Sequence, residues 1–215
     1  MRKNEELICL ARKCWKNMME NEPNLVIPLI NEMLDCNIPS KEKVKIQSRP
    51  ENVLEESEGL CVDIVDLFIA DKKYEMVCVC SIDGIMLLSC MDRVKKTPQN
   101  VYGHIAHFML LEDADVWSLD ANANNVRIKA KGIMDYSSNE IVNKKLWFLI
   151  PLVLLNFAKD KELVHKYYFY RADISKIMMH LLTALMVEVR GGNLDETTSK
   201  VVLAQCNSIL DFLNN

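Results

Sequence analysis

The sequence predicts a mixed α/β or α+β protein, in which a central mixed sheet is flanked by helices and followed by a helical C-terminal layer. Helical periodicity at the start, alternating and apolar strand-like runs in the middle, and helical periodicity again to the end support this class. A chain of 215 residues is long enough for one domain with a sizeable core. We expect a single domain, 1–215, made of a helical part and loop (1–60), a sheet core (61–135) and C-terminal helices (136–215).

The first part of the chain reads as two helices and a loop. Residues 4–20 place apolar side chains at helical spacing on one face. Asn24 is expected to cap a second helix that runs to about Cys36, with Pro28 tolerated near its first turn. Residues 37–59 are polar and contain two prolines, so they predict a long loop.

The middle of the chain reads as a sheet. Residues 61–70 and 74–81 are apolar strands joined by the short sequence Asp-Lys-Lys, which is typical of a hairpin. The run from residue 85 to 96 is too uniformly apolar for periodicity to decide, and we favour a helix. Further strands are expected at residues 104–111, 115–120 and 125–132; the last follows an Asn-rich turn and alternates apolar and basic residues.

The last part reads as a stack of helices. Ser137 and Glu140 have the spacing of a capping box at the start of an apolar helix. Gly191 and Gly192 can adopt the left-handed conformation that ends a helix. Three more helices are expected at residues 160–170, 173–189 and 195–213.

Composition and charge limit the classes of function. The formal net charge is −4, so nothing in the overall charge attracts the chain to nucleic acid, and any DNA contact would be local and weak. Eight cysteines without a signal peptide predict free, mostly buried thiols in a cytoplasmic protein. The longest apolar run, 146–158, is shorter than the roughly 20 residues of a membrane span and contains Pro151. We expect no membrane partner.

Two histidine-containing patterns have simple explanations. Cys78 and Cys80 lie on one face of a predicted strand, and His104 and His107 could complete a zinc site. The sequence has no Cys-x-x-Cys pair, so buried thiols and a surface histidine pair are favoured instead. His180 lies in a Met-rich helix, where a packed or edge histidine is favoured over a catalytic base.

An ordered set of motifs resembles a known family. An acidic strand is followed by "DKKYEMVCVCSIDGIMLL", by "KAKGIMDYSSNEIVNKKLWFLIPLVLLNFAKDKELV" and by two long helices. From about residue 60 onward this order resembles the recombination-promoting nucleases, transposase-like members of the PD-(D/E)XK nuclease superfamily with its restriction endonuclease-like fold. The residues that carry the second part of the resemblance are Tyr136, Ser137, Glu140, Ile141, Lys144, Lys145, Leu146 and Pro151.

The resemblance also shows where the sequence departs from the family. With Tyr74 aligned to the family's tyrosine, the Glu-x-Gln pair of the family falls on Val77 and Val79. A carboxylate pair is needed to hold Mg²⁺, which activates water and offsets charge on the phosphate, and valine offers no oxygen ligand. Asp63 and Asp66 of the acidic strand remain as a remnant metal site. They could equally be charges that solubilise or cap the hairpin.

We therefore expect a catalytically degenerate nuclease-like protein, a pseudoenzyme without a cofactor. It would act through protein–protein interaction, as a homodimer or by pairing with an active relative in a mobile-element or phage-defence setting. The alternative is an active Mg²⁺-dependent DNA endonuclease whose rearranged site uses Asp63, Asp66 and Glu75, helped by Lys72 or Lys73. A third possibility is an unrelated α/β binding domain.

Overall fold

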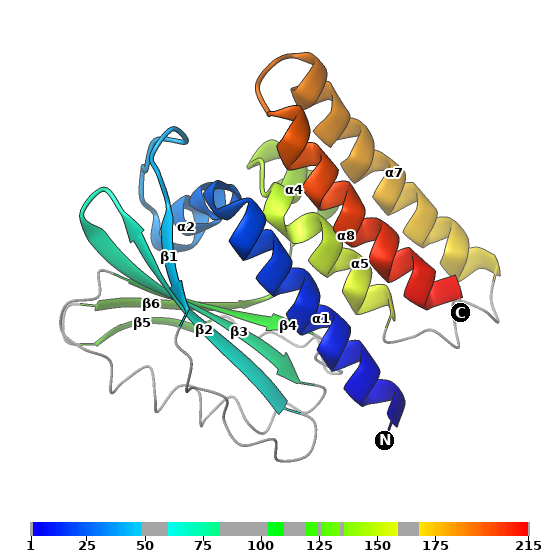
Figure 1. Ribbon diagram of the computed structural model, residues 1–215, viewed down its shortest axis with the longest axis horizontal. Helices are drawn as coiled ribbons and strands as arrows, with labels where there is room; N and C mark the ends of the chain where they lie inside the picture. Colours follow the sequence, from blue (N-terminus) through cyan, green and yellow to red (C-terminus); the bar gives the residue numbers. More distant parts are fainter. Residues whose placement is uncertain are drawn as a thin grey trace.

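A computed structural model defines the fold and describes residues 2–48, 60–81, 103–109, 119–123, 126–133, 136–158 and 168–214. The described chain is a mixed α and β structure, as the sequence predicts. Its helices and its sheet form separate layers (Figure 1).

The sheet has six strands in the order β1-β2-β3-β4-β6-β5. The first three strands pair antiparallel, β4 is parallel to both β3 and β6, and β5 is antiparallel to β6. The sheet is therefore mixed, as expected. The strand bounds are β1 Lys45–Ser48, β2 Leu60–Ile69, β3 Lys72–Ser81, β4 Gly103–Met109, β5 Leu119–Ala123 and β6 Val126–Gly132.

The helices lie in layers beside the sheet. α1 contacts β2 and β3, α2 contacts β4 and β6, and the C-terminal helices α5 and α8 pack on α1, with α7 beside them (Figure 1). The helix bounds are α1 Arg2–Asn21, η1 Pro23–Val26, α2 Ile27–Leu34, α4 Ser138–Asn143, η4 Trp147–Leu149, α5 Ile150–Ala158, α7 Tyr168–Arg190 and α8 Glu196–Asn214. None of the helices among the described residues is both long and apolar enough to span a membrane.

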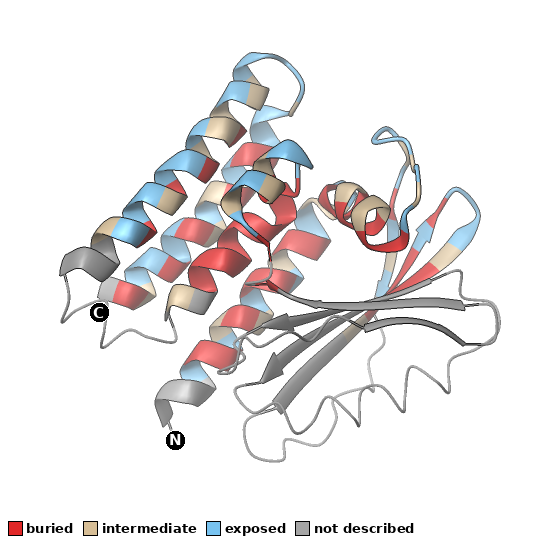
Figure 2. Cartoon of the chain, turned by 180° about the vertical axis from the view of Figure 1, so that it is seen from behind, coloured by how far each residue is buried: buried red, intermediate tan, exposed pale blue. Residues whose placement is uncertain are grey.

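The core is one continuous cluster that extends from the sheet through the first helices to the C-terminal helices α5, α7 and α8. Alternate residues of β2 and β3 are buried there, and Leu67 pairs with Tyr74 and Val65 with Met76. Because neighbours along a strand face opposite sides, the residues between them lie on the other face of the sheet. The apolar stripe of α1 is buried against this core (Figure 2).

The β2–β3 hairpin is confirmed, but its turn is tighter than predicted. Ile69 pairs with Lys72, so the loop contains only Ala70 and Asp71. Both loop residues have positive φ, 47° and 63°, as the two-residue turns that match strand twist require. The predicted Asp-Lys-Lys turn is therefore wrong in its last two residues, which already belong to β3.

The N-terminal helices are confirmed, with two corrections. Asn24 does not cap a helix; its side-chain oxygen accepts a hydrogen bond from the Val44 N–H at 3.2 Å instead. The polar segment predicted as loop contains the edge strand β1, which pairs with β2. Four residues of mostly polar character give too little alternation to predict an edge strand.

The expected capping box is present, but the helix predicted after it is broken. Ser137 accepts a hydrogen bond from the Glu140 N–H, and the Glu140 carboxylate accepts one from the Ser137 N–H. The helix ends after six residues because Lys145 has a φ of 56°. The Leu146 N–H then bonds the Ile141 carbonyl at 2.8 Å, which closes a Schellman-type end. The apolar periodicity of the sequence continues across this break, so the sequence pattern did not reveal the end of α4.

The remaining helix predictions are partly tested. Gly192 has a φ of 71° and ends α7 as predicted, and α8 is confirmed. β5 begins at Leu119 and includes Asn122 and Ala123, so the predicted Asn-rich turn is shorter than expected. The predicted helix at 85–96 and most of the predicted helix at 160–170 lie outside the described residues.

Candidate functional site

The β2–β3 hairpin brings two of the predicted site residues together. Asp66 and Glu75 are register partners on the antiparallel strands, so they lie side by side on the sheet face opposite the α1 core. Both residues are buried, with only 4% of their surface exposed. A buried carboxylate is costly unless a charged or hydrogen-bonding group compensates it, so this pair requires cationic or hydrogen-bonding neighbours.

Lys73 compensates the first of these carboxylates. Its Nζ lies 2.9 Å from Oδ2 of Asp66, and the Lys73 side chain is only 17% exposed. The same ammonium lies 5.8 Å from the centre of the Phe68 ring, which adds a cation–π contact. Lys73 is the register partner of Phe68, one pair closer to the turn than Asp66 and Glu75. The hairpin therefore carries a mostly desolvated ion pair beside a second buried carboxylate.

Asp63 has a different position in the strand. It pairs with Cys78, three residues along β2 from Asp66. Because successive strand residues face opposite sides, positions 63 and 66 of a regular strand, three residues apart, do not share a face. Within the described residues, no group of three or more His, Cys, Asp or Glu side chains is arranged to hold a metal ion.

The positions that the resemblance aligns with the family's Glu-x-Gln pair, and the residues of the zinc hypothesis, are placed only by their strands. Positions 75, 77 and 79 are every second residue of β3, so a regular strand places them on one face of the sheet, as the sequence predicts. His104 is the register partner of Glu75, and His107 is that of Cys78. The side chains of these valines, cysteines and histidines lie outside what the structure describes.

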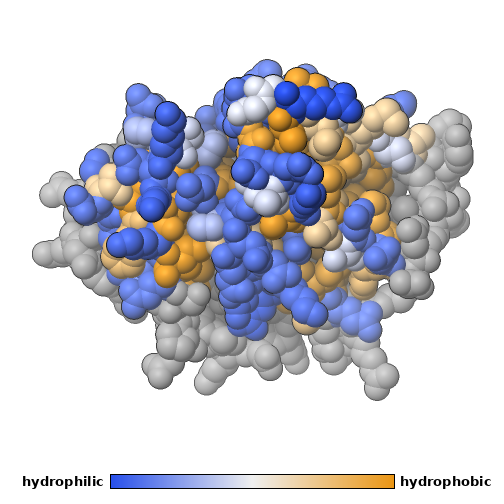
Figure 3. Space-filling model, turned by 45° about the horizontal axis from the view of Figure 1, so that its top comes forward, coloured by the Kyte–Doolittle hydropathy of each residue, from blue (hydrophilic) through white to orange (hydrophobic). Residues whose placement is uncertain are grey.

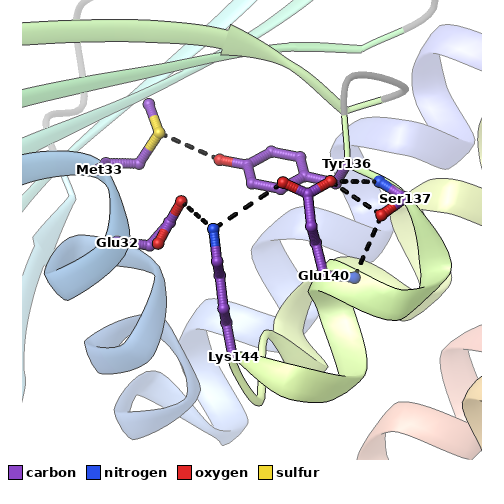
Figure 4. Close-up of polar contacts among 6 residues, drawn as sticks. All are labelled: Glu32, Met33, Tyr136, Ser137, Glu140 and Lys144. Carbon is purple, nitrogen blue, oxygen red and sulfur yellow. Dashed lines mark hydrogen bonds and ion pairs between the residues drawn. The ribbon is translucent and has the colours of Figure 1, made fainter.

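The second part of the family-like motif forms the junction between α4 and its neighbours (Figure 4). The Tyr136 hydroxyl is buried and donates a hydrogen bond to Sδ of Met33 in α2, at 3.0 Å. Ser137 and Glu140 form the capping box at the start of α4. Ile141 and Leu146 are fully buried in the core. These motif residues thus fix α4 against α2.

The two lysines of the motif carry ion pairs to other helices. Nζ of Lys144 lies 2.6 Å from Oε1 of Glu32 in α2 and 3.8 Å from Oε1 of Glu140 (Figure 4). The hydrogen bond with Glu32, more than any other contact, raises the pKa of Lys144 above its ordinary value. Nζ of Lys145 lies 2.6 Å from Oε2 of Glu188 in α7.

The backbone of Lys145, which forms the ion pair with Glu188, has a left-handed conformation that costs free energy. A non-glycine residue in the left-handed region costs about 1–2 kcal/mol, and glycine is the usual residue at this position of a helix end. An exposed ion pair contributes only about 0.2–1 kcal/mol, and the Lys145 side chain is 54% exposed. The ion pair with Glu188 therefore does not fully offset the strain.

Sequence reasoning missed the partners of these residues rather than the residues themselves. Met33, Glu32 and Glu188 are each more than 40 positions from the residues they contact. No local pattern signals such pairs. The Lys73–Asp66 contact had a signal in the sequence, because a two-residue hairpin turn places the two residues diagonally on one face.

His180, predicted from the sequence to be a packed or edge histidine, is exposed on α7.

Comparison of the chain with models of protein families, with curated proteins and with solved structures finds no match.

Proposed function

We propose that the chain is a catalytically degenerate nuclease-like protein of the PD-(D/E)XK type, whose remaining role is to bind another protein. The observation that carries this proposal is the ion pair between Lys73 and Asp66 at 2.9 Å. A divalent cation at the hairpin would need the Asp66 carboxylate as a ligand, and this carboxylate already holds an ammonium group. The mixed sheet and the helical C-terminal layer agree with the fold that the resemblance implies.

The chemistry of phosphate cleavage explains why a lysine paired with Asp66 favours the loss of nuclease activity. Mg²⁺ would supply two positive charges, bind the phosphate and acidify a water molecule. An ammonium group supplies one charge and no coordination site for water. Lys73 therefore balances the charge of Asp66 without providing the reactivity of a metal ion.

The protein-binding part of the proposal has support from the helical layer. α7 and α8 expose large apolar side chains, among them Met179 at 71% and Val187 at 59% of their surface. Apolar areas interrupt the charged surface on the face shown in Figure 3. Met side chains adapt well to partner surfaces. A homodimer or an active relative would be a suitable partner, in a mobile-element or phage-defence setting within the cytoplasm.

A nuclease assay tests the proposal. Purified protein is incubated with plasmid and single-stranded DNA in the presence of Mg²⁺ or Mn²⁺, beside the variants Asp66→Ala and Glu75→Ala. We expect no cleavage above the level of the variants. Metal-dependent cleavage that both substitutions abolish would overturn the proposal.

One observation favours a second candidate, an active metal-dependent DNA endonuclease. Asp66 and Glu75 lie side by side on one face, which is the arrangement that a carboxylate-bound Mg²⁺ needs. In this case these two residues would hold the ion and Lys73 would leave Asp66 when the metal binds, whereas Asp63, on the opposite face of a regular strand, would not be a ligand. The same assay decides between the two, and an Asp63→Ala variant reports whether that residue takes part.

A metal titration separates the candidates even without a known substrate. If Lys73 blocks the site, millimolar Mg²⁺ or Mn²⁺ does not change the melting temperature of the wild type, because only real binding stabilises the folded state. Under the endonuclease candidate the wild type is stabilised by metal, and Asp66→Ala abolishes the effect.

A further inference from the structure

The strand β1 stands at one end of the strand order and carries alternate lysines. Lys43 and Lys45 are exposed, and Lys41 is exposed in the turn just before them. Among the described strands, β1 pairs only with β2. Every second residue of such an edge strand directs its backbone N–H and C=O groups away from the sheet, where another strand can bond to them.

Alternation along the chain separates these lysines from the core. Val44 and Ile46 pack against the core. Lys43 and Lys45 alternate with them and therefore lie on the other face of the strand. Lys45 is the register partner of Phe68, which is exposed on that same face. The packing of β1 thus depends on its apolar residues and leaves the lysines at the surface.

The charge of these lysines is not compensated within the part of the chain that the structure describes. Among those residues, Lys41, Lys43 and Lys45 form no ion pair, in contrast to the lysines of the hairpin and of the α4 junction. Three positive charges along one edge favour an anionic partner. They also disfavour pairing with a second copy of the chain, which would bring the same lysines to the same edge.

We propose that an acidic, extended segment of a partner protein adds to the sheet as a strand beside β1. Its backbone bonds to the outer edge of β1, and its alternate Asp or Glu side chains lie beside Lys43 and Lys45. The inference rests on the proposed protein-binding function and names the place and the chemistry of the partner. Backbone bonding would accept any strand, and the lysines select an acidic one.

The probe is a fluorescent, capped heptapeptide of alternating Glu and Val, and binding is followed by fluorescence anisotropy. We expect saturable binding with a Kd below about 1 mM. Binding should weaken at high salt, because salt screens the attraction between exposed charges. A matched peptide with Lys in place of Glu should not bind. Absence of binding, or equal binding of the two peptides, would overturn the proposal.

Charge reversal in the protein tests the lysines. The double variant Lys43→Glu with Lys45→Glu should bind the acidic peptide at least tenfold more weakly and should bind the Lys peptide instead. The control, Lys13→Glu with Lys176→Glu, changes the net charge equally at exposed positions of α1 and α7 and should leave binding unchanged. Equal loss of binding in both double variants would mean attraction by net charge and would overturn the docking site.

Strand addition has a separate test that leaves the protein unaltered. N-methylation of one alternate set of peptide nitrogens removes the N–H donors that face β1, and methylation of the other set removes N–H groups that face solvent. We expect the first change to abolish binding and the second to preserve it. Equal effects of the two methylation patterns would overturn strand addition.

These outcomes are distinct from failure of the proposed function. DNA cleavage in the nuclease assay would overturn the degenerate-nuclease proposal and leave the peptide result intact, whereas failed peptide binding without cleavage would overturn the docking site alone.

Discussion

The β2–β3 hairpin and the α4 junction are both held by polar side chains, yet they differ in what those side chains do. At the junction, Tyr136 and Lys144 contact Met33 and Glu32 of α2, and Ser137 and Glu140 cap the start of α4. At the hairpin, Asp66 and Glu75 are buried side by side, and Lys73 compensates the charge of Asp66.

This difference explains what the resemblance to a nuclease family can support. The residues that carry the resemblance at the α4 junction have structural contacts within the chain, and those contacts do not depend on any activity. The proposed loss of activity rests instead on the hairpin, where the resemblance would align Val77 and Val79 with a carboxylate and a glutamine.

The largest effect is expected at the hairpin. Lys73→Met leaves the buried Asp66 carboxylate without its ammonium partner, and breaking a buried pair from one side costs about 3–5 kcal/mol. Chemical denaturation measures this loss. Lys72→Met, on the exposed neighbouring residue, is the control and should cost far less. A loss below about 1 kcal/mol for Lys73→Met would mean that the pair behaves like a surface ion pair.

The capping box at the junction should give an intermediate effect. Ser137→Ala removes the acceptor for the Glu140 N–H and is expected to cost about 1 kcal/mol. Adding Glu140→Ala, which removes the acceptor for the Ser137 N–H, should cost less than it does alone, because the two side chains form one unit. Strict additivity in a double-mutant cycle would contradict the reciprocal arrangement.

The hairpin turn offers a gain in stability. Ala70 has a φ of 47°, which an alanine adopts at a cost of about 1–2 kcal/mol. Ala70→Asn should recover about 1 kcal/mol of this, because asparagine tolerates the left-handed region in such turns. For a chain of this length the melting temperature would rise by about 2–4 °C. A fall in melting temperature would place the turn outside the two-residue class.

The smallest effect is the pH dependence of the junction. The pKa of Lys144 is raised in the folded protein, mainly by its hydrogen bond with Glu32. A raised lysine pKa contributes stability that is fully present below the unfolded value, about 10.4, and is lost as pH rises through the folded value. The side chain is 39% exposed, so screening limits the contribution to about 0.5 kcal/mol.

This contribution is measured as the difference in unfolding free energy between the wild type and Lys144→Met. It should be constant between about pH 7 and pH 9 and should shrink above about pH 10.5. A difference that instead grows at alkaline pH would contradict the assigned ion pair with Glu32.

Local signals in the sequence predicted much of the fold. The apolar stripe of α1, the hairpin and the Ser137–Glu140 capping box are patterns of a few neighbouring residues, and each is found in the structure. The errors lie where local patterns are silent or ambiguous. β1 is too short and polar to recognise, and the break at Lys145 falls in a residue type that rarely takes the left-handed conformation.

The sequence by itself determined which residues are candidates for chemistry, because a carboxylate such as Asp66 or Glu75 can bind a metal ion and a valine cannot, whatever the fold. It could not say how those candidates are grouped. Strand register decided that Asp66 faces Glu75 and that Asp63 pairs with Cys78 instead. Tertiary packing decided the partners of Tyr136, Lys144 and Lys145, because those contacts join segments that are distant along the chain. Pairing at such separation depends on the whole fold, which no short stretch of sequence contains.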